Sequence, residues 1–134
     1  MKFIICIDRN NGMLFNNRRQ SSDLAVIDRI IKLIDNKKLY MNHYSAELFN
    51  GNENIIVNDG FFSLAGEDDY CFIESSVSNI ADANEIILIN WNRNYPYDVS
   101  FDIDLISNGF KKVSSENFKG HSHKKITMIK YRRN

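Results

Sequence analysis

The sequence predicts a single α/β domain, spanning residues 1–134, in which a mixed β-sheet is flanked by helices. The chain can build one sizeable core, because 43% of its 134 residues are hydrophobic and 12% are aromatic. Apolar runs of strand length alternate with helical segments in the first half. Strands dominate the second half, where the last two are expected to pair antiparallel. No repeat, low-complexity tract or linker divides the chain.

The chain begins with a predicted buried strand, and the clearest predicted helix follows. The apolar run "KFIICI" predicts a strand over residues 2–7, and "DRNNG" then supplies turn residues. A helix is predicted from Ser22 or Asp23 to about Asp35, because apolar residues recur there at helical spacing. These residues are Leu24, Ile27, Ile30, Ile31 and Ile34. We expect Ser21 or Ser22 to cap this helix.

The middle of the chain predicts short strands that alternate with short helices. Strands are predicted at residues 37–42, 54–57 and 70–74. Short helices or single helical turns are predicted at residues 45–49, 61–66 and 78–83. Asn42 or Ser45 lies near the start of the first of these helices, where a polar side chain can cap it.

The last third of the chain is rich in predicted strands. The run "EIILINW" at 85–91 is the strongest strand prediction. The only proline, Pro96, lies in the loop that follows, and the alternating segment "SFDIDLI" comes next. Residues 110–118 and 126–132 are expected to form an antiparallel, hairpin-like pair.

Charge and cysteine content exclude several classes of protein. The 17 basic residues balance the 17 acidic ones, which argues against a general polyanion binder such as a nucleic-acid-coating protein. Cys6 and Cys71 lie inside apolar runs, where they are expected to be small core residues of a reducing compartment. The first apolar run is too short for a secretion signal or a membrane span. We therefore expect a cytoplasmic protein with no membrane partner.

The segment 11–23, within "NNGMLFNNRRQSSDL", is too polar for a simple connector between a strand and a helix. It is either a functional loop or a decorated helix cap. Arg18, Arg19 and Gln20 form the densest set of anion-recognising groups in the chain, and guanidinium groups near a helix start suit phosphate or carboxylate. The alternative is a solvated loop whose arginines pair with nearby acidic residues.

The order of these pieces resembles dihydrofolate reductase. In that family a buried strand leads into a mobile loop containing Gly-Met, and Asp-Leu then opens the first helix. The resemblance implies a three-layer fold and places Asp23 at the family's active-site carboxylate, with Met13 in the loop. The run "KLYMNHYSAELF" is similar to the family's strand, phosphate-binding turn and helix, and it contains His43 and Ser45.

Several departures from that family imply that reductase activity has been lost. His43 stands where the family has a phosphate-binding arginine, and the chain has no Gly-Gly pair for the turn that holds the dinucleotide. Too little sequence separates the strands at 70–74 and 85–91 for the missing strand and helix. The arginine expected to bind the folate tail is also absent from "GNEN". The resemblance thus implies that the NADPH site is missing and that no cofactor is bound.

The opening motif also resembles short bacterial proteins that carry a ribonuclease Z label. True ribonuclease Z binds two metal ions through a His-x-His-x-Asp-His motif. The nearest match here is "HSHKKI" at 121–126, and the chain has three histidines in total. His121 and His123 would point the same way in a strand, as a metal site requires, but a surface hairpin is the favoured interpretation.

Three functions remain open from the sequence. The first is a domain that binds an anionic or heterocyclic small molecule under the 11–23 loop. The second is a phosphodiester hydrolase, in which Arg18 or Arg19 stabilises charge and His43 or His123 transfers protons. The third is a non-catalytic module that docks a protein or a nucleic acid, the nucleic acid being the less favoured. The candidate residues are Asp23 and His43 for catalysis, and Met13, Arg18, Arg19, Gln20 and Ser45 for binding, with no metal ligand.

Overall fold

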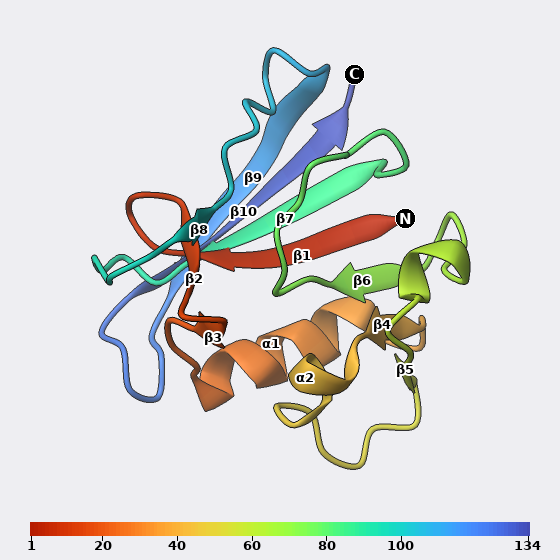
Figure 1. Ribbon diagram of the computed structural model, residues 1–134, viewed down its shortest axis with the longest axis horizontal. Helices are drawn as coiled ribbons and strands as arrows, with labels where there is room; N and C mark the ends of the chain where they lie inside the picture. The colour runs from red at the N-terminus through yellow and green to blue at the C-terminus, as the bar shows by residue number, and fades with distance from the viewer.

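A seven-stranded mixed sheet forms the centre of the molecule (Figure 1). The computed structural model describes all 134 residues, and the sheet has the order β5-β4-β6-β1-β7-β10-β9. Its strands are β1 (Lys2–Ile7), β4 (Leu39–Met41), β5 (Ile55–Val57), β6 (Tyr70–Phe72), β7 (Glu85–Asn90), β9 (Phe110–Phe118) and β10 (Ile126–Arg133). The first five of these run parallel, whereas β10 is antiparallel to both of its neighbours.

The parallel strands β1 and β7 pair over their whole length, from Lys2 opposite Glu85 to Ile7 opposite Asn90. Both are buried on their two faces, which explains why their sequences are nearly continuous apolar runs. The chain then turns back through the long β9–β10 hairpin at the edge of the sheet. The predicted mixed sheet with antiparallel C-terminal strands is therefore confirmed.

The helices are few and short. Helix α1 spans Leu24–Ile34, and α2 is a single turn over His43–Ala46. A 3-10 turn, η1, follows at Phe61–Ser63. With 11 residues in the longest of them, none of the helices could cross a bilayer.

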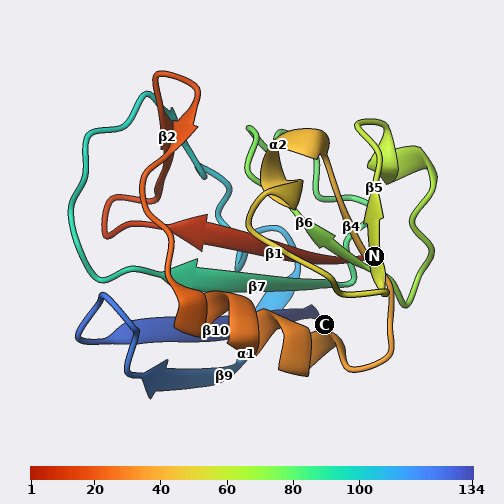
Figure 2. The ribbon, with the colours of Figure 1, turned by 90° about the horizontal axis from the view of Figure 1, so that it is seen from below.

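Two separate cores pack on the two faces of the sheet. Helix α1 buries Val26, Ile30 and Ile34 against one face (Figures 1 and 2). A smaller three-stranded sheet, β3-β2-β8, covers part of the other face together with loops. Its strands are β2 (Gly12–Phe15), β3 (Arg18–Arg19) and β8 (Val99–Ser100). Alternate residues of β1 enter the two cores, as the period of a strand requires.

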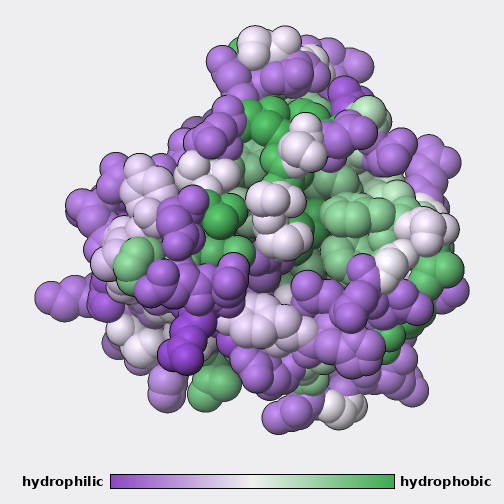
Figure 3. Space-filling model, in the orientation of Figure 1, coloured by the Kyte–Doolittle hydropathy of each residue, from purple (hydrophilic) through white to green (hydrophobic).

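On the face seen in Figure 1, apolar residues gather in the middle and polar residues frame them (Figure 3). The chain between β6 and β7 crosses this face as a loop (Figure 1). Beside it a cavity of about 280 Å³ lies next to Phe3 and Phe62. Both chain termini lie at the same end of the sheet (Figure 1).

Three sequence predictions about helices need correction. Residues 78–83 form turns instead of a helix, because the side chain of Asn79 accepts a hydrogen bond from the backbone N–H of Ala81. Asp23, and neither Ser21 nor Ser22, caps α1 by accepting from the N–H of Ala25. Helix α2 also begins two residues earlier than predicted, because Asn42 caps it through the N–H of Ser45.

Candidate functional site

Residues 12–19 of the segment 11–23 form a β-hairpin and not an irregular loop. Strands β2 and β3 pair antiparallel, with Phe15 opposite Arg18, and Asn16 and Asn17 form the turn. Both asparagines have positive φ, 51° and 62°. A two-residue hairpin turn that matches the twist of its strands needs positive φ at both positions, and asparagine tolerates this conformation. Because successive side chains of a strand point to opposite faces, Arg18 and Arg19 lie in different surroundings.

A cavity of about 480 Å³ lies between this hairpin and the loop that follows β7. It is lined by Phe15, Asn16, Arg18, Arg19, Gln20, Tyr95 and Pro96. Arg18 is exposed, and its guanidinium takes part in no hydrogen bond or ion pair. The structure thus places three of the predicted binding residues, Arg18, Arg19 and Gln20, in the wall of one cavity.

Arg19, unlike its neighbour, is fully engaged by acidic partners. Its guanidinium forms two hydrogen bonds to Glu74, at 2.8 and 3.0 Å, and one to Glu47 at 2.6 Å. The group also lies over the ring of Tyr44, and Ser45 donates to Glu74 at 2.8 Å. These carboxylates raise the pKa of Arg19 further above its ordinary value, against the effect of partial burial. Arg19 is therefore a cross-link between β3, α2 and the end of β6.

The buried carboxylate of Asp8 holds in place Gln20 and Tyr95, two residues that line the cavity. It accepts hydrogen bonds from the backbone N–H groups of Gly12 and Tyr95 and from Nε2 of Gln20, at 2.8, 3.0 and 3.0 Å. Nε2 of Gln20 also donates to the carbonyl of Pro96 at 3.3 Å. The amide oxygen of Gln20 is buried and has no hydrogen-bond partner. A buried acceptor without a donor is costly.

Asp23 is buried at the start of α1 and accepts five hydrogen bonds. Oδ1 accepts from the N–H groups of Ala25 and His121, both at 2.8 Å. Oδ2 accepts from the N–H and hydroxyl of Ser122, at 2.9 and 3.1 Å, and pairs with Nδ1 of His123 at 2.8 Å. Burial raises the pKa of Asp23, but these hydrogen bonds outweigh it and hold the pKa well below its ordinary value. The carboxylate is ionised and has both oxygens occupied.

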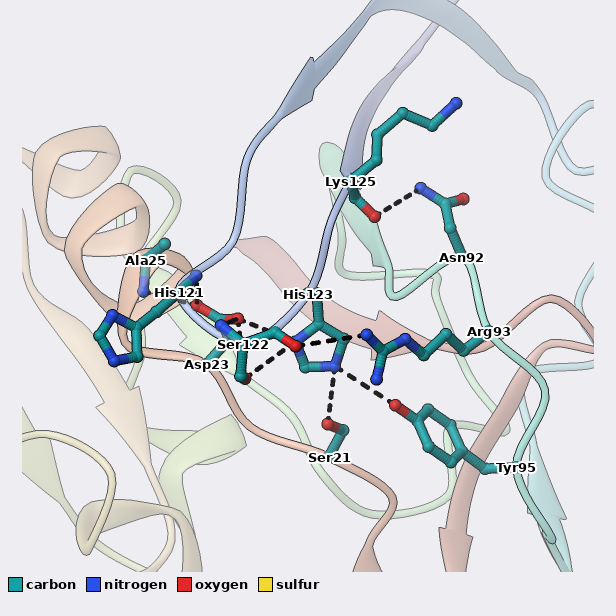
Figure 4. A network of polar contacts seen from close by, with 10 residues as sticks. All are labelled: Ser21, Asp23, Ala25, Asn92, Arg93, Tyr95, His121, Ser122, His123 and Lys125. Atoms are coloured by element: carbon teal, nitrogen blue, oxygen red, sulfur yellow. Dashed lines mark hydrogen bonds and ion pairs between the residues drawn. The ribbon is translucent and has the colours of Figure 1, made fainter.

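The other ring nitrogen of His123 faces two hydroxyl groups (Figure 4). Its Nε2 lies 2.9 Å from Oγ of Ser21 and 3.3 Å from the hydroxyl of Tyr95. The ring stacks on Trp91, with 4.8 Å between ring centroids, and only 4% of His123 is exposed. Ser21, His123 and Asp23 therefore form a continuous hydrogen-bonded chain.

Of the remaining predicted residues, Met13 and His43 lie apart from the cavity beside Arg18 and from the hydrogen bonds of Asp23, whereas Ser45 belongs to the contacts around Arg19. Met13 is buried in the core, with 5% exposed. Ser45 is buried and hydrogen-bonded to Glu74. His43 is exposed at the start of α2, and its Nδ1 lies 3.0 Å from Oδ1 of Asp59. The structure brings neither Met13 nor His43 to the cavity beside Arg18.

The prediction that His121 and His123 both lie in a surface hairpin is right for His121 only. His121 is exposed, but His123 is buried, and both lie in the β9–β10 connection and not in a strand. The difference arises because the connection folds back over α1, where Asp23 holds it. No three His, Cys, Asp or Glu side chains are grouped so as to hold a metal ion.

The two cysteines are both free and lie in strands of the sheet. Burial raises the pKa of the Cys71 thiol to about 12, and it raises that of Cys6 as well. Thiols of this kind are mostly protonated at neutral pH and are poor nucleophiles.

Sequence reasoning did not select Asp8, Glu74 or Ser21. Asp8 and Glu74 follow the carboxyl ends of the parallel strands β1 and β6. Polar residues there gather at one edge of a sheet, so their position was a usable signal. Ser21 gave no such signal, because its partner His123 is 102 residues away.

The comparison with known proteins identifies the fold. No known protein family and no curated protein matches the chain in sequence. The dihydrofolate reductase of Enterococcus faecalis, solved in complex with NADP(H) and RAB-propyl, matches in structure with a TM-score of 0.71. The match covers 99% of this chain and 95% of that enzyme, at 10% sequence identity. The chain therefore has a dihydrofolate-reductase-like fold, which confirms the resemblance drawn from the sequence.

Proposed function

We propose that this chain, which has a dihydrofolate-reductase-like fold, binds an anionic or heterocyclic small molecule under the 11–23 hairpin and does not reduce folate. The observation that carries this proposal is the unpaired guanidinium of Arg18 in the wall of a cavity of about 480 Å³. Exposed arginines are common. Arg18, however, lines a cavity together with Gln20, whose amide oxygen has no partner, and the ring of Tyr95, and such a set of groups is suited to recognise a small molecule.

The cavity offers three kinds of contact to such a molecule. Arg18 supplies five N–H donors and a permanent positive charge for a phosphate or carboxylate. The rings of Phe15 and Tyr95 supply flat apolar surface for a heterocycle. The buried oxygen of Gln20 can accept a hydrogen bond from a ring N–H or an amino group.

The positive charge that the site can offer to an anion rests on Arg18 alone. Arg19 lines the same cavity, but Glu47 and Glu74 already neutralise it. An anion that displaced these carboxylates would leave Glu74, whose side chain is 8% exposed, buried and unpaired. We therefore assign Arg19 to the wall and Arg18 to the ligand.

The residues present do not fit the nicotinamide cofactor of the family. That family holds the dinucleotide phosphates on a glycine-rich turn and a helix start between two of its later strands. Here β6 and β7 are joined by residues 73–84, which form loops and turns without a helix. No helix start is present there to receive a pyrophosphate, so we propose that NADPH is not a cofactor.

The surroundings of Asp23 also argue against folate reduction. The resemblance to dihydrofolate reductase implies that this carboxylate contacts a ring nitrogen of the substrate. In this chain five hydrogen bonds from the protein already occupy the carboxylate. The space next to Asp23, Val26 and Trp91 measures about 10 Å³, room for no more than about one water molecule. We propose that the ligand binds on the other side of the hairpin, at Arg18.

The geometry favours binding over phosphodiester cleavage. That alternative needs an arginine and a histidine at one phosphate. His43 lies away from the cavity and pairs with Asp59, and Arg19 is already paired. His123 is buried against Asp23 and Trp91 and does not line the cavity beside Arg18. A docking module for a protein or a nucleic acid would use Arg18 as one contact in a wider surface, and the size of the cavity favours a small ligand.

A thermal-shift screen tests the proposal. Folic acid, NADP⁺ and adenosine 5′-monophosphate (AMP) are each added at 1–5 mM, on the order of weak affinities, with adenosine as the uncharged control. We expect AMP to raise the melting temperature of the wild type and not that of Arg18→Ala. Adenosine should raise the melting temperature of the wild type less than AMP does. If no anion shifts the wild type, or if Arg18→Ala responds equally, this cavity is not the binding site.

We place the protein in the cytoplasm, as the sequence led us to expect. Both cysteines are free thiols in the sheet, and they are compatible with a reducing compartment. Fractionation of cells that express the tagged full chain tests this placement.

A further inference from the structure

We propose that Ser21, His123 and Asp23 form a serine-nucleophile triad that hydrolyses carboxylic esters with short acyl groups. Oγ of Ser21 lies 2.9 Å from Nε2 of His123, and Nδ1 of the same ring lies 2.8 Å from Oδ2 of Asp23 (Figure 4). Both distances are within the hydrogen-bond range of an activated nucleophile and its base. This inference uses other residues than the anion site and stands whether or not Arg18 binds a ligand.

The hydrogen bonds around Asp23 fix the tautomer of His123. An ionised carboxylate only accepts, so Nδ1 of His123 carries the proton that it donates to Oδ2 of Asp23. In the neutral ring Nε2 is then the acceptor, and it faces the hydroxyl of Ser21. This is the orientation that lets a histidine remove a proton from serine.

Asp23 and His123 are held rigidly and shielded from water. The side chain of Asp23 is fully buried and that of His123 is 3% exposed. Trp91 stacks on one face of the histidine ring at an interplanar angle of 27°. Preorganisation of this kind strengthens the electrostatic support that the carboxylate gives to an imidazolium. An exposed histidine–carboxylate pair on the surface would lack this preorganisation.

Two donors lie near the point where negative charge would develop. The hydroxyl of Tyr95 is 3.3 Å from the same Nε2, on the side of the ring that Ser21 faces (Figure 4). The backbone N–H of Ser22, the residue after the nucleophile, has no acceptor in the protein. Together they can donate to the oxyanion of a tetrahedral intermediate, as backbone and side-chain donors do in other acyl-transfer sites.

The shape of the site limits the acyl group. Ser21 is partly exposed, so an ester can approach it from solvent. The space behind it, toward Val26, Leu48 and Trp91, is only about 10 Å³. No buried channel is present there for a long chain, so short acyl groups such as acetyl are preferred.

The reaction consumes only an ester and water. Oγ of Ser21 attacks the carbonyl carbon while its proton moves to Nε2 of His123. The bond to the alcohol oxygen then breaks, and the alcohol leaves with that proton, which yields an acyl-serine. Water attacks this ester with Nε2 again as the base, and Nε2 returns the proton to Oγ as the carboxylic acid leaves.

Covalent labelling of the full chain tests the inference. Wild type is treated with diisopropyl fluorophosphate, which phosphorylates activated serines and releases fluoride, and is then analysed by intact mass and peptide mapping. We expect a single adduct on Ser21 and none on Ser21→Ala, while Ser78→Ala, which changes an exposed serine between β6 and β7, is labelled like wild type. His123→Gln should slow labelling by about 100-fold, since a general base typically contributes that much. Circular dichroism is the check that each variant is folded.

Ester turnover is the second readout. Wild type should hydrolyse 4-nitrophenyl acetate faster than 4-nitrophenyl octanoate, and Ser21→Ala should do neither above background. No adduct on Ser21 of the wild type, an adduct elsewhere, or labelling of His123→Gln at the wild-type rate would overturn the triad. None of these results depends on whether Arg18 binds an anion, so the two proposals fail separately.

Discussion

Nδ1 of His123 lies 2.8 Å from Oδ2 of Asp23, although 100 residues separate them in the chain. This pair joins the start of α1 to the connection between β9 and β10. The resemblance drawn from the sequence led us to expect that this carboxylate faces a ligand. In this chain it faces the protein instead, and the consequences can be measured as stability, pH dependence and binding.

Replacing the carboxylate of Asp23 should weaken the fold. We expect Asp23→Asn to lower the free energy of unfolding by about 3 kcal/mol, because the amide cannot match the donors that now surround Oδ1 and Oδ2. Urea denaturation at pH 7 measures the change. Asp28→Asn on the exposed side of the same helix is the control and should alter stability by less than about 0.5 kcal/mol. Equal effects of the two would contradict the role of the network.

The network also predicts how stability depends on pH. The pKa of Asp23 is lowered in the folded state, whereas in the unfolded chain it lies near its ordinary value of about 3.9. Between these two values the unfolded chain binds more protons, so the free energy of unfolding rises with pH. The contribution is complete above about pH 5 and is lost as the pH falls below about 4.

Urea titrations of the wild type between pH 2.5 and 7, roughly the span around the ordinary aspartate pKa, measure this loss. Asp23→Asn has no titrating group at this position and should show a shallower decline on the acid side. Parallel curves for the two proteins would show that Asp23 is not the group responsible.

Gly120 permits the close approach of the β9–β10 connection to Asp23. A Cβ atom at this position would lie 2.6 Å from Oδ2 of Asp23 and 2.8 Å from the carbonyl oxygen of His123. We expect Gly120→Ala to destabilise the fold by about 2 kcal/mol, because the buried hydrogen bonds must lengthen or break. At Gly66 the nearest atom to a Cβ is a carboxylate oxygen of Asp69 at 3.3 Å, so Gly66→Ala should cost clearly less. Thermal melts of the two variants compare them directly.

The adjacent arginines should separate stability from binding. Arg19→Ala leaves the nearly buried Glu74 without its two guanidinium hydrogen bonds, and we expect a loss of about 3 kcal/mol in unfolding free energy. Arg18→Ala removes no contact within the protein and should leave stability within about 0.5 kcal/mol of wild type. Chemical denaturation measures both. A large loss in Arg18→Ala would mean that its guanidinium has a structural partner.

Much of the fold follows from local patterns in the sequence. Strand β7 and helix α1 are set by apolar runs with the right period, and both were predicted within one or two residues. Residues 78–83 were predicted as a short helix. The structure has an Asx turn at Asn79 in place of this helix, because so short a helix gains little stability from packing.

The site could be predicted only in part, since its contacts are long-range. The sequence marked Arg18 and Arg19 as equals, and only the pairing of Arg19 with Glu74, 55 residues away, distinguishes them. Asp23 was selected through a resemblance, but its five donors come mainly from a connection almost 100 residues later. The burial of His123 depends on that same contact, so no local pattern could reveal it.

The most direct test of the proposed function is a ¹H–¹⁵N NMR titration of wild type and Arg18→Ala with AMP, and of wild type with adenosine. We predict AMP-dependent shifts confined to the hairpin at residues 12–20 and the loop around Tyr95. Loss of the guanidinium in Arg18→Ala should weaken the affinity for AMP by about 10-fold or more, which is the effect of losing one charge-assisted hydrogen bond. Adenosine should bind more weakly than AMP. Shifts elsewhere, none at all, or equal AMP affinities in the two proteins would contradict an anion site at Arg18.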